Sequence, residues 1–86
     1  MPEAPEHRLK RLGMRSWRRG TKEMDLILGP YSDEVLDVLD PDALNAYEAL
    51  LGENDQDLYA WITGQIPEPP AHGSVIAEIR AFHKID

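Results

Sequence analysis

Two consecutive stretches decide the fold of this 86-residue chain: Asp40-Pro-Asp-Ala-Leu-Asn-Ala-Tyr-Glu-Ala-Leu-Leu-Gly52 and Asn54-Asp-Gln-Asp-Leu-Tyr-Ala-Trp-Ile-Thr-Gly64. Asp40 can cap a helix, and Pro41 suits the first helical turn. Each stretch ends at a glycine, which is common just after the last turn of a helix. The apolar residues between these signals recur at helical spacing: Leu44, Tyr47, Leu50 and Leu51, then Leu58, Trp61 and Ile62. The pattern predicts two short helices, each with one apolar face.

The same spacing continues upstream of this pair. The apolar residues there are Met24, Ile27, Leu28, Tyr31, Val35 and Leu39. Pro30 interrupts the stretch because it has no amide hydrogen and crowds the preceding turn, so we expect a kinked helix or two short ones. Before it, a basic helix is expected to start near His7 or Arg8, with Leu9, Leu12 and Trp17 as its apolar contacts.

Downstream, residues 65–73 form a proline-rich segment that predicts a stiff, extended loop. Ser74 can cap a last helix that carries Val75, Ile76, Ile79 and Phe82 on one face. No strand-like alternation appears. The sequence therefore predicts an all-α fold: a single domain, residues 7–86, built as a small bundle of about five short helices, after a flexible lead-in of residues 1–6.

The composition limits what the chain can do. It contains no cysteine, which excludes disulfides and thiolate chemistry, and its histidines are too far apart in sequence for the common metal motifs. No apolar run approaches the roughly 18–20 residues needed to span a bilayer. No signal-peptide core precedes the basic residues near the N-terminus. We therefore expect a bacterial cytoplasmic protein that binds no metal and does not enter a membrane.

Charge is distributed unevenly along the chain. Residues 1–22 hold seven Lys or Arg against two Glu, whereas residues 23–86 hold two against fourteen Asp or Glu. This asymmetry makes a dipole that can orient a partner during encounter. A basic helix carrying a tryptophan is also compatible with nucleic-acid binding, although the formal net charge of −7 argues against it.

Residues with the chemistry of an enzyme are not grouped in any recognisable motif. The carboxylates mostly fall at helix starts, where the helix dipole favours them. There is no nucleophile elbow and no glycine-rich phosphate loop. We therefore expect a binding protein with no catalytic residues.

The segment Arg18-Arg-Gly-Thr-Lys-Glu23 is the most informative one for function. If residues 19–25 were helical, Arg19 and Glu23 would lie one turn apart, and Gly20 would leave their shared face bare for another backbone or a flat cofactor. The competing interpretation is that Gly20 simply breaks a helix. Spacing alone does not decide between the two.

Here the sequence resembles a known family. Arg19-Gly20-Thr21-Lys22-Glu23 matches the Arg-Gly-x-x-Glu signature of the succinate dehydrogenase flavinylation factors, the SdhE family, whose mitochondrial relatives are succinate dehydrogenase assembly factor 2. Two further stretches, 47–51 and 55–62, resemble the family's aromatic-x-x-Leu-Leu and Asp-x-Asp-Leu-x-x-Trp-Leu patterns. Thr21 departs from the family, in which methionine is frequent at this position. The resemblance covers roughly residues 8–85.

The resemblance implies a five-helix chaperone that binds the flavoprotein subunit of succinate dehydrogenase, and often that of fumarate reductase, in a transient complex. It promotes the client's own covalent attachment of FAD, so FAD belongs to the client, and we expect no tightly bound cofactor and a monomer when free. By carry-over, the partner-binding residues are Arg18, Arg19, Gly20, Lys22, Glu23 and Asp25. The alternative function is a small nucleic-acid-binding or toxin-neutralising module that uses the basic N-terminal helix.

Overall fold

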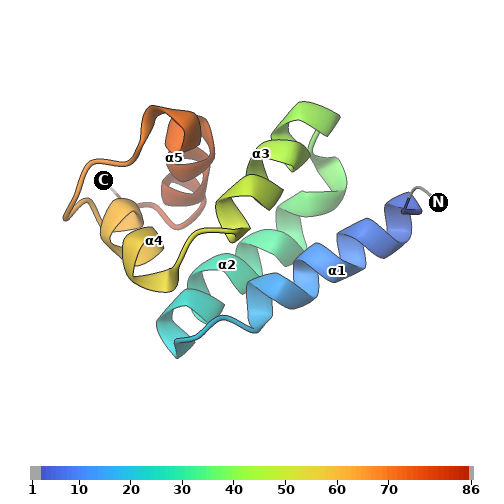
Figure 1. The fold of residues 1–86 in the computed structure, drawn as a ribbon, viewed down its shortest axis with the longest axis horizontal. Helices are drawn as coiled ribbons and strands as arrows, with labels where there is room; N and C mark the ends of the chain where they lie inside the picture. Colours follow the sequence, from blue (N-terminus) through green and yellow to red (C-terminus); the bar gives the residue numbers. More distant parts are fainter. Residues whose placement is uncertain (1–2, 86) are drawn as a thin grey trace.

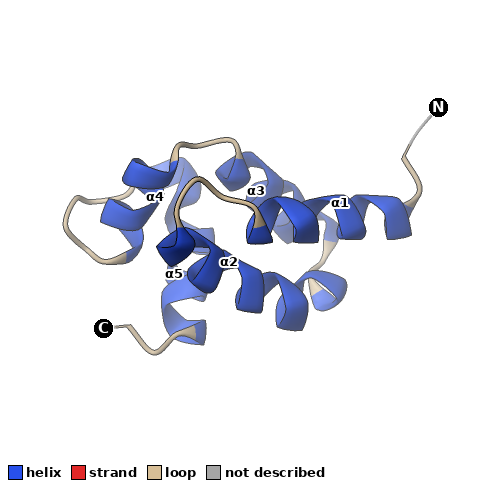
Figure 2. Ribbon diagram, turned by 90° about the horizontal axis from the view of Figure 1, so that it is seen from below, coloured by secondary structure: helices blue, strands red, loops and turns tan. Residues whose placement is uncertain are grey.

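A computed structural model describes residues 3–85. Its helices are α1 (Pro5–Trp17), α2 (Lys22–Val35), α3 (Pro41–Leu51), α4 (Asp55–Ile62) and α5 (Gly73–Phe82), with short 3₁₀ turns at Leu36–Val38 and Pro70–His72. Figure 2 shows helices and loops and no strand in this part of the chain. The prediction of an all-α fold with five short helices is confirmed.

The ends of α2, α3 and α4 follow from local sequence. The side chains of Thr21, Asp40 and Asn54 each accept a hydrogen bond from a backbone amide in the first turn of the helix that follows. After α4, Gly64 has a φ of 81°, the left-handed conformation that glycine adopts at no steric cost. The stop expected at Gly52 is also observed, but its φ of −76° means that the turn does not depend on a left-handed glycine.

Three expected boundaries differ in the structure. α1 begins at Pro5, earlier than His7, because proline fits the first helical turn and Ala4 just before it is extended. Residues 5 and 6 of the expected lead-in are therefore helical, while residues 1 and 2 lie outside the described residues. α5 begins at Gly73, so Ser74 lies inside the helix and does not cap it.

Pro30 lies within one continuous helix, so the alternative of two short helices is wrong. Proline cannot donate to the carbonyl of Leu26, four residues earlier. Leu26 is 53% exposed, so the turn that lacks this hydrogen bond lies at the surface of the domain. The helix tolerates the missing donor because it falls on a solvated turn.

Figure 1 shows α1 and α2 side by side and antiparallel, with α3 against them and α4 and α5 together at the other end of the molecule. The apolar faces of all five helices meet in one core. Its fully buried members include Leu12, Met24, Leu28, Tyr47, Leu50, Leu58, Ile62, Ile76 and Ile79. No helix of the described residues combines the length and apolarity that crossing a membrane requires.

Trp17 is the clearest exception to the predicted core. It is 40% exposed, and its indole lies against Gly29 of α2 on the outside of the α1–α2 pair. Its Nε1 donates a hydrogen bond to the Asp33 carboxylate at 3.1 Å. Phe82, at 36% exposed, also lies at the margin of the core, edge-on to the ring of Tyr31. Both aromatic residues cover the core and do not belong to its interior.

Candidate functional site: the loop between α1 and α2

The arginine and glycine of the signature lie in a loop. α1 ends at Trp17 and α2 begins at Lys22, so Arg19 and Gly20 are not helical. The expected helical face with Arg19 and Glu23 one turn apart is therefore wrong, and the interpretation of Gly20 as part of a helix break is correct. The structure nevertheless gives this break a specific internal architecture.

Arg19 points into the molecule. Its guanidinium donates from Nε to Asp55 Oδ1 at 2.8 Å, from Nη1 to the Leu51 carbonyl at 3.0 Å, and from Nη2 to the Glu53 carbonyl at 2.9 Å. The side chain is only 10% exposed. Leu51 is the last residue of α3, where carbonyls lack helical partners and a cation is favourable. Arg19 thus joins the loop to the end of α3 and the start of α4.

Asp55 accepts hydrogen bonds from two residues of the loop, Arg19 and Gly20. One carboxylate oxygen accepts from the Arg19 guanidinium, and the other accepts from the Gly20 backbone amide. A Cβ atom added at Gly20 would lie 2.7 Å from that second oxygen, closer than real Cβ atoms approach oxygen. Any other residue at position 20 would therefore displace the Asp55 carboxylate, which Arg19 also contacts.

The start of α2 closes the other side of the loop. The Arg19 amide donates to Asp25 Oδ1 at 2.6 Å. Thr21 accepts from the Met24 amide and caps α2. Arg19 is therefore fixed through its backbone by α2 and through its side chain by α3 and α4. We call this set of contacts, made by Arg19, Gly20, Asp25 and Asp55, the loop clamp.

The predicted partner-binding residues other than Arg19 and Asp25 present atoms to solvent. Arg18, Lys22 and Glu23 have exposed side chains, and Gly20 exposes its backbone. None of these three side chains has an ion-pair partner within residues 3–85. The six predicted residues are thus brought together, but they divide into Arg19 and Asp25, which hold the loop, and four that present atoms to solvent.

A shallow recess adjoins the loop between the start of α2 and α4. It is lined by Thr21, Glu23, Asp55, Gln56 and Tyr59. The lining offers two carboxylates, a side-chain amide, a hydroxyl and an exposed aromatic ring, all of which can make hydrogen bonds or stacking contacts. Within residues 3–85, no group of three or more His, Cys, Asp or Glu is placed to hold a metal ion.

Other arginines of α1 also turn toward α3. Arg8 and Arg11 pair with Glu48 at 2.8 and 2.9 Å, and Arg15 donates to the Leu51 carbonyl at 3.1 Å. The hydrogen bond from Arg11 is the main reason why the pKa of Glu48 is lowered. Much of the N-terminal positive charge is therefore used inside the domain to attach α1 to α3.

One buried polar pair also joins α1 to α3. The Ser16 and Tyr47 hydroxyls are 2.6 Å apart, and Ser16 also donates to the Leu12 carbonyl. Burial raises the pKa of Tyr47 to about 12. The pair gives the α1–α3 contact a fixed register, because neither hydroxyl can leave its partner without losing a buried hydrogen bond.

Asp55 is the functional residue that the sequence did not reveal. It was expected to serve the start of a helix, and it is indeed the first residue of α4. The sequence held one indication of another role: Asn54 caps α4, so the carboxylate of Asp55 is not needed for capping. Nothing local, however, links Asp55 to a glycine 35 residues earlier.

The fold and the loop define a class: a small helical domain whose distinctive feature is a surface loop held from within. The family described as the flavinator of succinate dehydrogenase matches residues 10–83, and the chain belongs to this family. The resemblance drawn from the signature is thereby confirmed.

Individual relatives agree with this assignment. The chain is 35% identical over 92 residues to succinate dehydrogenase assembly factor 2, mitochondrial, of Drosophila grimshawi, covering 96% of this chain and 63% of the relative. It is 37% identical over 67 residues to the FAD assembly factor SdhE of Photobacterium profundum, covering 77% and 76%. Against the Penicillium rubens assembly factor 2 the identity is 41% over 58 residues, covering 67% of this chain and 19% of the relative. The chain thus spans less than two thirds of these two mitochondrial relatives, and no solved structure gives a significant match.

Proposed function

We propose that this protein is an assembly factor that binds the flavoprotein subunit of succinate dehydrogenase, and also that of fumarate reductase, and promotes covalent attachment of FAD. The family and the names of its relatives support this proposal. The single observation that carries the site is the loop clamp, which fixes the Arg-Gly-x-x-Glu signature as a rigid surface feature.

Rigidity is what a docking element needs. A loop that is already ordered loses little conformational entropy when it binds, so more of the contact energy appears as affinity. In this proposal Arg18, Lys22 and Glu23 contact the client, and the exposed Gly20 backbone allows it to approach closely. Arg19 and Asp25 act from beneath by holding the loop.

The protein acts by binding and not by catalysis in this proposal. FAD is a ligand of the client, where its flavin ring becomes linked to a client side chain. That reaction needs the two reacting groups to be held in attack geometry. A partner that binds one arrangement of the client more tightly than the others shifts the population toward it. The factor must then dissociate, so moderate affinity is expected.

The proposal is tested by co-expressing the chain with a succinate dehydrogenase flavoprotein subunit and measuring covalent flavin by in-gel fluorescence. We expect more covalent flavin with the chain than without it. Equal fluorescence in both cases would refute the proposal. Repeating the test with a fumarate reductase subunit shows whether both clients respond.

Contact residues are tested with variants that leave the loop clamp intact. We expect Glu23→Ala to reduce covalent flavin several-fold at unchanged thermal stability, because Glu23 is exposed. Glu34→Ala is the matched control, since Glu34 is also an exposed residue of α2, about three turns further along. Equal activity of the two variants would remove Glu23 from the contact surface.

A further inference from the structure

A shallow groove runs along α1, separate from the loop clamp for most of its length. It is lined by His7, Lys10, Arg11, Met14, Arg15, Arg18 and Arg19. These residues form two rows, one of His7, Lys10, Met14 and Arg18 and the other of Arg11, Arg15 and Arg19. Within α1 the members of each row are three or four residues apart and lie along one face of the helix, and Arg18 and Arg19 extend the rows just beyond its last residue.

The two rows offer different chemistry. The heads of Arg11, Arg15 and Arg19 bond to Glu48, the Leu51 carbonyl and Asp55, so these residues present mainly their aliphatic stems to the groove. Lys10 and Arg18 have exposed heads and no ion-pair partner within the described chain. Met14 lies between them and is 44% exposed.

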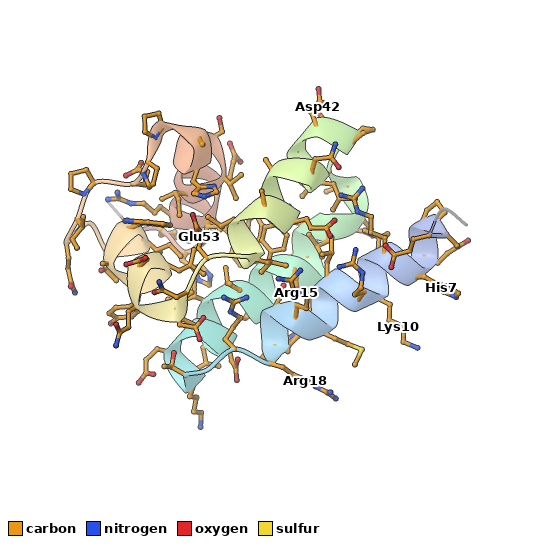
Figure 3. The ribbon with its side chains drawn as sticks, in the orientation of Figure 1. His7, Lys10, Arg15, Arg18, Asp42 and Glu53 are labelled. Atoms are coloured by element: carbon orange, nitrogen blue, oxygen red, sulfur yellow. The ribbon has the colours of Figure 1, made fainter. Side chains whose placement is uncertain are left out.

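Figure 3 shows His7, Lys10 and Arg18 extending from α1 on the side away from α3. The groove is therefore apolar along its length and positive along its outer rim. A single exposed apolar side chain is common on a protein surface. Here it lies in a groove between two cations without an ion-pair partner in the described residues, and a partner that carries carboxylates beside an apolar side chain complements both features.

We propose that this groove receives an acidic segment of the client flavoprotein subunit, one that carries carboxylates beside an apolar side chain. Carboxylates of the client would pair with Lys10 and Arg18, and an apolar side chain would cover Met14. Arg18 belongs to both the groove and the signature loop, so the two surfaces are continuous. This inference rests on the proposed function and extends the contact from the loop along α1.

Charge favours a protein over a nucleic acid as the occupant. Duplex binding requires several cations arranged to meet phosphates, whereas most arginines of α1 are already bonded within the domain. The rest of the chain, residues 23–86, carries fourteen acidic residues against two basic ones and would repel a long polyanion. A short acidic protein segment can bind in the groove without extending over the negatively charged surface of residues 23–86.

The test measures the dissociation constant between the full chain and a purified flavoprotein subunit lacking FAD. Lys10→Glu should weaken binding about tenfold at about 0.1 M salt, because one attraction becomes a repulsion at a rim position. The deficit should shrink at about 1 M salt, where the screening length falls from about 10 Å to about 3 Å. Met14→Ser should weaken binding several-fold at both salt concentrations, because its contribution is apolar.

Lys84→Glu is the matched control, since it makes the same charge change at an exposed position beyond α5. We expect it to bind like the wild type, and circular dichroism checks that all variants fold. If Lys10→Glu and Lys84→Glu bind equally, the groove assignment is overturned while the proposed function stands. If the wild type does not bind the subunit, the proposed function itself fails and the groove assignment with it. Binding of duplex DNA that Lys10→Glu abolishes, together with unchanged binding of the subunit, would assign the groove to nucleic acid instead.

Discussion

Replacing Asp55 with asparagine measures how much the loop clamp contributes to the protein. The carboxylate accepts from Arg19 Nε at 2.8 Å and from the Gly20 amide. Asparagine has one acceptor oxygen, so its NH₂ group must face one of these two donors. At least one charge-assisted hydrogen bond is then lost, and the buried guanidinium loses its only carboxylate partner within the described residues.

A hydrogen bond to a charged group contributes roughly 1.5–3 kcal/mol. The side chains of Arg19 and Asp55 are only 10% and 16% exposed, so water compensates little. We therefore expect Asp55→Asn to lower the free energy of unfolding by about 2–3 kcal/mol. For a domain of this size that corresponds to a fall in melting temperature of roughly 8–24 °C. The helices should still form, since their core is untouched.

Urea denaturation followed by tryptophan fluorescence gives the change in stability, and amide hydrogen exchange at Gly20 gives the local effect. Asp57→Asn is the control, because Asp57 lies in the same first turn of α4 but is exposed. It should cost under about 1 kcal/mol, most of it from the helix dipole. If both variants lose the same stability, or if the exchange of Gly20 is unchanged, the loop clamp does not hold the loop and the reasoning fails.

Three further substitutions test the packing. A Cβ atom added at Gly29 would come within 2.3 Å of the Trp17 ring, so Gly29→Ala should displace the indole, cost about 1–3 kcal/mol and shift the fluorescence of Trp17. A Cβ atom added at Gly13, within α1, meets no other atom, so Gly13→Ala should raise the free energy of unfolding by about 0.5–1 kcal/mol. Thermal melts should therefore show a higher melting temperature for Gly13→Ala and a lower one for Gly29→Ala. Because the pKa of Tyr47 is raised to about 12 in the folded state, its unfolded form ionises first. The contribution of Tyr47 to the free energy of unfolding is fully present below about pH 10. It is lost as the pH rises from 10 toward 12, and the loss reaches up to about 3 kcal/mol. Tyr47→Phe should remove that part of the alkaline loss, whereas Tyr59→Phe, at an exposed position, should leave it in place; identical pH curves for the two would contradict the assignment.

The sequence by itself determined the helices and most of the core. Caps at Asp40 and Asn54 and the stop at Gly64 act through hydrogen bonds and backbone conformations that span only a few residues, so they can be recognised without the fold. The period of the apolar residues likewise reports which face of a helix is buried. The signature 19–23 was recognisable as a motif for the same reason: its residues are adjacent.

Only the tertiary structure decided what the residues of that motif do. One of the two interpretations placed Arg19 and Glu23 one turn apart on a helix, but Arg19 lies in a loop and reaches Asp55, 36 positions away in the chain. Gly20 was interpreted either as a bare face for another molecule or as a helix break; it lies in a break, and a Cβ atom there would approach the same carboxylate within 2.7 Å. Trp17 has the spacing of a core residue but lies on the outside of α2.

The physical reason is that ion pairs and close approaches depend on distance in space, and local periodicity carries no information about contacts between helices. Residues 18–23 were identified from sequence as the informative segment. The structure showed that Arg19 and Asp25 hold this loop from within, while Arg18, Lys22 and Glu23 face solvent.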